Sequence, residues 1–169
     1  DDMVELSYEG YGPGGVAVMV ECMTDNRNRT VGDVRYSFTK RGGNLGTDGS
    51  VAYLFRRIGQ ISFAPGVDEE ALLDAALDAG ADDINSHADN SVDVETSFEE
   101  YLKVKDALIA AGFEPLHSEI AMVAEVTVPL DKEGAETLLA LIDSLEDLDD
   151  VQNVYTNADI PDDVLAQLD

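Results

Sequence analysis

The sequence predicts an α+β protein made of two domains, one of which is inserted in the other. Between residues 60 and 124 the hydrophobic patterns follow the order β-α-β-β-α-β, which is the split βαβ arrangement of ferredoxin-like domains. The residues before this segment follow the order β-α-β, and those after it β-α-β with a short final helix. Neither flanking part alone provides a sheet covered by helices, whereas the two together do. We therefore expect a discontinuous α+β domain, 1–59 with 125–169, and an inserted ferredoxin-like domain, 60–124.

The chain begins with a glycine-rich entry, Tyr8 to Gly15, which leads into the apolar run Val16 to Met23. A continuous apolar run of this length is typical of a buried strand. A helix is predicted next, and it begins at a cap formed by Asn28 or Thr30, because such side chains accept hydrogen bonds from the first free N–H groups.

The predicted helix is amphipathic. Spacings of three and four residues place Val31, Val34 and Phe38 on one face. Tyr36 is its other apolar residue. Lys40 and Arg41 occupy the last turn, where cations suit the helix dipole.

A glycine-rich segment separates this helix from the next predicted strand. Gly42 and Gly43 end the helix, and Gly43–Gly49 contains too many glycines for regular structure. The segment Ser50–Arg56 returns as a strand, and Gly59 interrupts the pattern.

The inserted domain is predicted from two helices and four strands. Acidic residues in the first turn and Gly80 just past the end mark its first helix. The composition of Ala88–Ser91 is that of a turn between two short strands. In chain order the expected elements are Gln60–Ala64, the helix Asp68–Asp78, Ile84–His87, Val92–Thr96, the helix Phe98–Ala110, and Leu116–Met122.

The returning part of the discontinuous domain starts with a strand at Glu125–Val128 that ends at Pro129. A helix at Lys132–Leu145 follows, because its apolar residues recur at core spacing. Val151–Thr156 is predicted as a strand. Ile160–Leu168 is predicted as a short helix with proline in its first turn.

The net charge of −26 is unevenly distributed. Residues 1–60 carry a net charge of −1 and residues 61–169 a net charge of −25. The acidic part should repel nucleic acid and remain well solvated. Seven of the ten basic residues lie between positions 27 and 57. These are Arg27, Arg29, Arg35, Lys40, Arg41, Arg56 and Arg57.

This basic set has two interpretations. A local group of arginines suits contact with phosphates, since each neutralised phosphate releases counterions. Tyr8, Tyr11, Tyr36 and Tyr53 are interleaved with the set and offer faces on which bases can stack. Alternatively, the arginines pair with the acidic surface of the protein or with a neighbouring domain.

No catalytic or cofactor-binding constellation is evident, and we expect neither enzymatic activity nor a cofactor. Cys22 lies in an apolar strand and is expected to be a small buried side chain. His87, Asp89 and Asp93 have the composition of a metal site but are better explained as a solvated turn. The glycine loops do not precede a helix, as phosphate-binding loops must, so we interpret them as turns and sites of close packing. His117 has no nucleophile beside it in the sequence.

The sequence contains no signal peptide or membrane-spanning segment that we can recognise. No apolar run approaches the ~18 residues that a bilayer-spanning helix needs. The start has no basic and apolar segments typical of a signal peptide, so we expect a cytoplasmic protein that does not bind membranes. The single cysteine also favours a reducing compartment. The first residue is not methionine, and we expect a missing upstream segment.

Four segments of the chain form a distinctive set, namely YEGYGPGG (8–15), TDNRNRTV (24–31), GGNLGTDGSVAYLF (42–55) and LIDSLEDLDDVQNVYTN (141–157). They resemble the YebC/PmpR family, which includes the mitochondrial translational activator of cytochrome c oxidase. The resemblance implies three domains, namely a basic helical N-terminal domain and two α+β domains, one inserted in the other. The helical domain has no counterpart here, so the chain is expected to be a fragment.

The resemblance also implies a non-enzymatic regulator of gene expression. Members are described as DNA-binding transcriptional regulators or as ribosome-associated factors that relieve stalled translation. The expected partner is therefore DNA or ribosomal RNA, with the ribosome as a further candidate. Two other interpretations remain open. In one, the acidic inserted domain is a protein-interaction module for a basic partner. In the other, which rests on fold analogy, it binds a small molecule.

Overall fold

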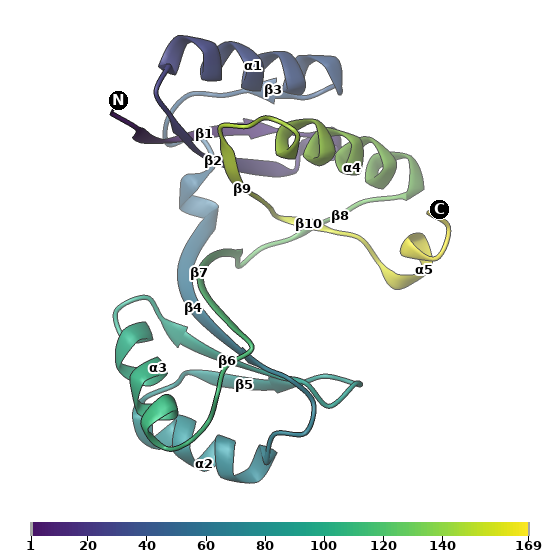
Figure 1. The fold of residues 1–169 in the computed structure, drawn as a ribbon. Coiled ribbons are helices and arrows are strands. Elements are labelled where there is room, and N and C mark those ends of the chain that lie inside the picture. The colour runs from purple at the N-terminus through teal and green to yellow at the C-terminus, as the bar shows by residue number, and fades with distance from the viewer. Residues whose placement is uncertain (1, 169) are drawn as a thin grey trace. The chain divides into compact units, whose positions relative to one another are not determined.

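The computed structural model describes residues 2–168 and divides them into two compact units. The first unit comprises the residues up to Arg56 together with those from Val123 onward, and the second comprises Arg57–Met122. Figure 1 shows the elements of both. The predicted α+β class, with one ferredoxin-like domain inserted in a discontinuous one, is confirmed.

The first unit contains a four-stranded sheet in the order β3-β1-β2-β9. Each neighbouring pair of strands in it is antiparallel. Its elements are β1 (Val4–Tyr11), β2 (Ala17–Thr24), α1 (Arg27–Lys40), β3 (Asn44–Leu45), α4 (Lys132–Glu146) and β9 (Val151–Thr156). A parallel pair, β8 (Val128–Pro129) with β10 (Ala158–Asp159), and the short helix α5 (Asp162–Leu165) complete the unit.

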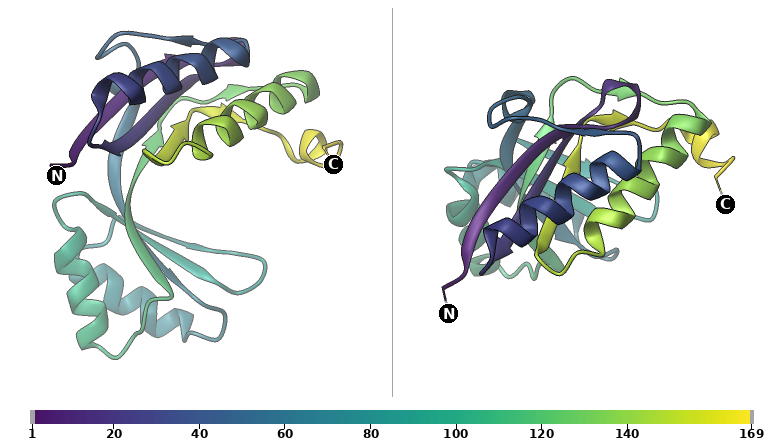
Figure 2. Two further views of the ribbon diagram at one scale, coloured as in Figure 1. Left: turned by 45° about the horizontal axis from the view of Figure 1, so that its top comes forward. Right: turned by 90° about the horizontal axis from the view of Figure 1, so that it is seen from above.

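The core of the first unit lies between this sheet and the helices α1 and α4, which lie side by side in Figure 2. Val18 and Val20 point from β2 into the same cluster as Phe38 of α1 and Leu138 of α4. All four side chains are at most 1% exposed. Burial of such side chains contributes about 1.5–3 kcal/mol each, so this cluster is what holds α1 against the sheet.

The second unit is a four-stranded sheet in the order β5-β6-β4-β7, with α2 and α3 packed into one shared core. Its elements are β4 (Phe55–Phe63), α2 (Glu69–Ala79), β5 (Asp83–Ser86), β6 (Val92–Ser97), α3 (Tyr101–Ala110) and β7 (His117–Ala124). This is the expected β-α-β-β-α-β order. Phe63 and Phe113 meet edge to face in its core, with ring centroids 6.4 Å apart.

Two predicted strands are wrong. Residues 52–54 of the expected strand Ser50–Arg56 form the short 3₁₀ helix η2 (Ala52–Leu54). The Glu9 carboxylate accepts hydrogen bonds from the N–H groups of Gly49, Val51 and Ala52, which curls the chain there. The expected strand Glu125–Val128 is reduced to β8, because its only partner, β10, is equally short.

The interruption predicted at Gly59 is also wrong, since β4 runs through it. Gly59 pairs with Thr96 of β6. A Cβ atom at Gly59 would lie 2.3 Å from the Thr96 hydroxyl oxygen and 2.4 Å from a ring carbon of Tyr101. The glycine is therefore required for close packing within a strand.

Several element ends differ from their predicted positions. The α1 cap is Asn26, in place of Asn28 or Thr30. Helix α3 begins at Tyr101 because residues 98–100 form a turn. The glycine-rich entry is in part strand β1, and β3 and β10 are further strands that the sequence patterns did not reveal. Within residues 2–168 we find no helix that is both long and apolar enough to cross a membrane.

Candidate nucleic-acid interface

Helix α1 carries four of the seven predicted basic residues, Arg27, Arg29, Arg35 and Lys40, and Arg41 forms its C-cap. The helix begins where the Asn26 side chain accepts a hydrogen bond from the Arg29 N–H at 3.0 Å. Gly42, with a φ of 79°, directs the chain away from the helix end. The orientation of α1 on its core decides which of these cations face solvent.

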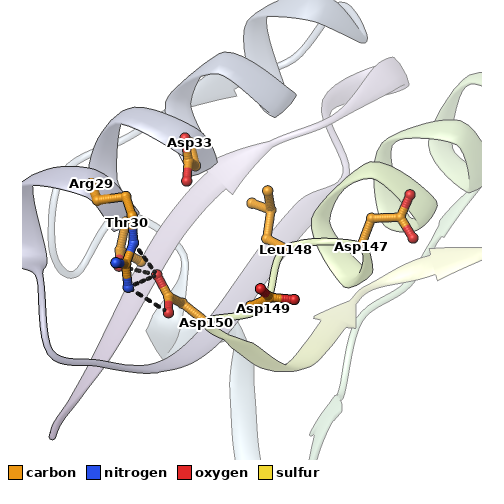
Figure 3. A pocket seen from close by; sticks show the side chains of 7 residues that line it. All are labelled: Arg29, Thr30, Asp33, Asp147, Leu148, Asp149 and Asp150. Atoms are coloured by element: carbon orange, nitrogen blue, oxygen red, sulfur yellow. Dashed lines mark hydrogen bonds and ion pairs between the residues drawn. The ribbon is translucent and has the colours of Figure 1, made fainter.

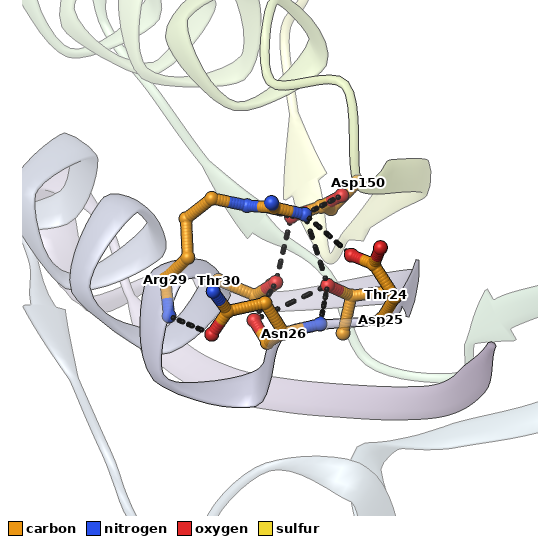
Figure 4. A network of polar contacts seen from close by, with 6 residues as sticks. All are labelled: Thr24, Asp25, Asn26, Arg29, Thr30 and Asp150. Atoms are coloured by element: carbon orange, nitrogen blue, oxygen red, sulfur yellow. Dashed lines mark hydrogen bonds and ion pairs between the residues drawn. The ribbon is translucent and has the colours of Figure 1, made fainter. Parts of the chain in front are cut away.

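Arg29 is committed to the protein itself. Its guanidinium Nη2 lies 3.0 Å from one Asp150 carboxylate oxygen and 3.1 Å from Asp25. Thr30, which is buried, donates a hydrogen bond to the same Asp150 carboxylate at 2.7 Å. Figure 4 shows how these contacts tie the start of α1 to the turn before β9. The interpretation of the arginines as internal ion-pair partners is thus correct for Arg29.

The Asp150 carboxylate is stabilised in its charged form. Its hydrogen bond from Thr30 lowers its pKa, burial opposes this, and the bond and charge of Arg29 lower it further. The net effect is a pKa below the ordinary aspartate value. A group that remains ionised holds Arg29 in place throughout the neutral pH range.

A cavity of about 370 Å³ lies next to this network, between α1 and the end of α4. Four aspartates line it, as Figure 3 shows. These are Asp33, Asp147, Asp149 and Asp150, and Arg29 is the only basic side chain among the lining residues. This flank of α1 is unsuited to phosphate because its carboxylates outnumber its cations.

The other cations of α1, namely Arg27, Arg35 and Lys40, are exposed to solvent. Within residues 2–168, neither Arg27 nor Arg35 forms an ion pair. Tyr36 is 65% exposed, and the Lys40 ammonium lies 5.7 Å from the centre of its ring. We call the exposed residues Arg27, Arg35, Tyr36 and Lys40 the α1 basic face. Along a helix it extends for about 20 Å. At about 100° per residue its members are distributed around the helix and do not form a single row along it.

The three remaining predicted residues do not belong to the α1 basic face. Arg41 donates from Nε to the Ser144 hydroxyl at 3.2 Å. Arg56, on β4, forms an ion pair with Glu125 at 3.2 Å. Arg57 lies in the second unit, with its guanidinium 5.6 Å from the centre of the Phe98 ring.

Other polar groups singled out in the sequence are explained by local bonding. Burial and the nearby Asp150 charge raise the pKa of Cys22 to about 11, so its thiol is protonated at neutral pH. His87 Nε2 lies 2.7 Å from Asp93, and Asp89 accepts hydrogen bonds from Ser91. The residues of the turn are therefore already bonded within it.

The sequence patterns did not single out Glu9 or Asp150, and they indicated Thr30 only as a candidate helix cap. Glu9 is only 7% exposed, although it is charged. Its neighbours in the sequence are glycine, serine and tyrosine, and this pattern does not indicate that the carboxylate is buried. The three N–H groups that bind the carboxylate come from residues forty or more positions away. Asp150 is one of several acids in an acidic turn and was equally indistinguishable.

Residues 3–158 match the family described as the TACO1/YebC second and third domain. The chain belongs to this family. It is 66% identical to the transcriptional regulatory protein PmpR of Pseudomonas aeruginosa strain PAO1 over 168 residues, which cover 99% of the chain and 68% of that relative. It is 68% identical, with the same coverage, to a probable transcriptional regulatory protein of Pseudomonas fluorescens strain Pf0-1.

A solved structure of the same fold comes from Aquifex aeolicus, a conserved hypothetical protein that is 44% identical to this chain. The two superpose with a TM-score of 0.84 over 96% of this chain and 67% of the other. The resemblance seen in the sequence motifs is thereby confirmed. In TACO1/YebC terms, the chain corresponds to the second and third domains.

Proposed function

We propose that this chain is part of a non-enzymatic regulator of gene expression that contacts DNA through the α1 basic face. The observation that carries the proposal is the pair of exposed arginines, Arg27 and Arg35, that no acidic side chain of the described residues neutralises. The names of the relatives, transcriptional regulatory proteins, favour DNA as the nucleic acid.

The large negative charge of the protein does not oppose this proposal at short range. At physiological ionic strength, charges separated by more than about 8 Å are largely screened. A phosphate that touches α1 therefore interacts mainly with the nearest cations. Residues 1–60, which include α1, have a net charge of −1, and most of the acidic residues of the same unit lie in the returning part of the chain, from Val123 onward.

Tyr36 adds a chemical feature that a purely ionic surface lacks. Its exposed ring, 5.7 Å from the Lys40 ammonium, is available to stack on a base or to pack on a sugar. Phosphate contacts from arginine with one aromatic contact would give binding with little dependence on sequence. Sequence selectivity would have to come from other parts of the protein.

The test is the double charge reversal Arg27→Glu with Arg35→Glu. We expect DNA affinity to fall at least about tenfold and the slope of log K against log salt to decrease by about 2, one for each lost phosphate contact. The measurement is fluorescence anisotropy with labelled duplex DNA over a salt series. The matched control is Lys103→Glu with Lys105→Glu, which changes the net charge equally but lies in the second unit.

Equal losses in the two double variants would show an effect of net charge alone and would overturn the proposed interface. Co-sedimentation with ribosomes, at the same salt, tests the alternative target. Binding to ribosomes that depends on Arg27 and Arg35, without binding to DNA, would replace the transcriptional role by a translational one.

A further inference from the structure

Helix α2 of the second unit exposes two leucines that are not part of the core of that unit. Leu73 is 40% exposed and Leu77 is 56% exposed. The opposite side of the helix supplies Leu72, Ala76 and Ala79 to the core. Leu73 and Leu77 are four residues apart, so they form one apolar row along the helix surface.

Three carboxylates run beside this row. Glu70, Asp74 and Asp78 are spaced by four residues and are all exposed. Within residues 2–168 none of the three forms an ion pair or a side-chain hydrogen bond, whereas Glu69 is hydrogen-bonded to Ser86. We call Glu70, Leu73, Asp74, Leu77 and Asp78 the α2 surface. It extends for about 12 Å along the helix.

The charge of the whole second unit determines the kind of partner that can approach. Arg57–Met122 carries fifteen Asp and Glu against three Lys and Arg. Helix α2 itself contains no basic residue. Lys103, which lies near the end of α2 at Gly80, is paired with Glu100 at 3.4 Å. Nucleic acid and acidic membranes are repelled by such a field, and basic polypeptides are attracted.

We propose that the α2 surface binds a basic amphipathic helix of another protein. The two leucines would pack against the apolar row of the partner helix, as the side-chain ridges of two neighbouring helices do. The three carboxylates would face Lys or Arg side chains spaced by one turn on that helix. The complex would be weak, in the micromolar range, because the surface is small. This function is independent of the α1 basic face.

The probe is a synthetic peptide of about 18 residues, with Leu and Lys at helical spacing so that one face is apolar and its flank basic. Binding to the intact protein is measured by fluorescence anisotropy. We expect Leu73→Ala with Leu77→Ala to weaken binding at least about fivefold. The matched control is Leu102→Ala with Leu116→Ala, which removes two exposed leucines of the same unit and should leave affinity unchanged.

The carboxylates are tested in the same way. Glu70→Gln with Asp74→Asn and Asp78→Asn should weaken binding and reduce its salt dependence, because three ion pairs are lost. The control, Glu99→Gln with Asp106→Asn and Glu114→Gln, removes the same charge elsewhere on the unit. Thermal unfolding verifies that each variant is folded.

Three results would overturn the proposal. A scrambled peptide of the same composition that binds equally well would show general attraction to an acidic protein. Equal losses in test and control variants would show that the site is not on α2. Sedimentation analysis that shows a dimer, dissociated by Leu73→Ala with Leu77→Ala, would identify a second copy of this chain as the occupant.

Discussion

The arginines of helix α1 differ in their bonding and therefore in their roles. Arg29 is bonded to Asp150 and Asp25 and links the start of α1 to the turn before β9. Arg27 and Arg35 extend from the same helix without such partners among residues 2–168. A substitution at Arg29 would therefore disturb the fold as well as the charge, and only Arg27 and Arg35 can be changed to test binding alone.

Glu9 is a buried carboxylate that binds the backbone of residues 49–52. Its carboxylate accepts three backbone hydrogen bonds, of 2.7, 2.9 and 2.6 Å, from Gly49, Val51 and Ala52. Burial by itself would raise the pKa of Glu9, but the three N–H donors outweigh it and the pKa is lowered. Such donors stabilise the ionised form selectively.

We predict that Glu9→Gln destabilises the first unit by about 2 kcal/mol at neutral pH, since hydrogen bonds to a charged group are worth about 1.5–3 kcal/mol. Because the pKa of Glu9 is lowered in the folded state, its carboxylate stabilises the fold fully above the unfolded-state pKa of about 4.3. This stabilisation is lost as the pH falls through the folded-state pKa. The difference between wild type and variant should therefore shrink below about pH 4. Urea unfolding at several pH values measures it.

The exposed Glu5 on the same strand provides the control. Glu5→Gln should change the free energy of unfolding by no more than about 0.5 kcal/mol at any pH. A constant difference between wild type and Glu9→Gln down to low pH would contradict a role for the Glu9 charge.

At the scale of elements, β1 and β3 approach each other closely because glycines lie at their contact. A Cβ atom at Gly10 would lie 2.6 Å from the Asn44 carbonyl oxygen and 2.7 Å from the Phe38 ring. At Gly43 the corresponding distance to the Tyr11 carbonyl oxygen is 2.4 Å. Gly10 and Gly43 of the glycine-rich motifs thus serve close packing, which agrees with the positions of these motifs relative to the helices.

We predict that Gly10→Ala destabilises the protein by about 1–3 kcal/mol, the usual cost of overpacking a core. Gly32, on the exposed side of α1, is the matched control, because a Cβ atom there meets no atom within 4 Å. Gly32→Ala should stabilise by about 0.5–1 kcal/mol, since alanine favours the helix. Chemical denaturation of both variants measures the difference, and opposite signs are expected.

At the scale of the whole molecule, charge is unevenly distributed along the sequence, whereas both structural units are acidic. Net charge is close to zero over residues 1–60 and strongly negative beyond them. The second unit has its own core, in which nine buried residues from β4, β6 and both helices meet. We infer that it is a domain that folds by itself.

We predict that a fragment of residues 57–122 folds independently. Domains of about 60 residues often do so, with stabilities of about 3–5 kcal/mol. Cutting at residue 60 would remove Ile58 and Gly59, which pair with β6, so this shorter fragment should be less stable. Urea unfolding followed by circular dichroism compares the two. Absence of a cooperative transition in 57–122 would show that the second unit needs the first.

The sequence by itself determined the order of the helices α1 to α4, the order of the strands of the second unit and the basic character of α1. Local patterns suffice there, because helix periodicity and turn composition act over a few neighbouring residues. The segments α2, α4 and β9 were accordingly predicted to within a residue or two. The family motifs, which are local as well, identified the TACO1/YebC group.

Only the tertiary structure decided which cations remain available and which are used internally. Asp150 lies 121 residues from Arg29, and Glu9 lies at least 40 residues from the N–H groups it binds. No local pattern reports such pairings. The two-residue strands β3, β8 and β10 likewise exist only because a partner strand is brought alongside. The sequence offered seven basic residues as candidates. Contacts between distant residues therefore decide which of them belong to the α1 basic face.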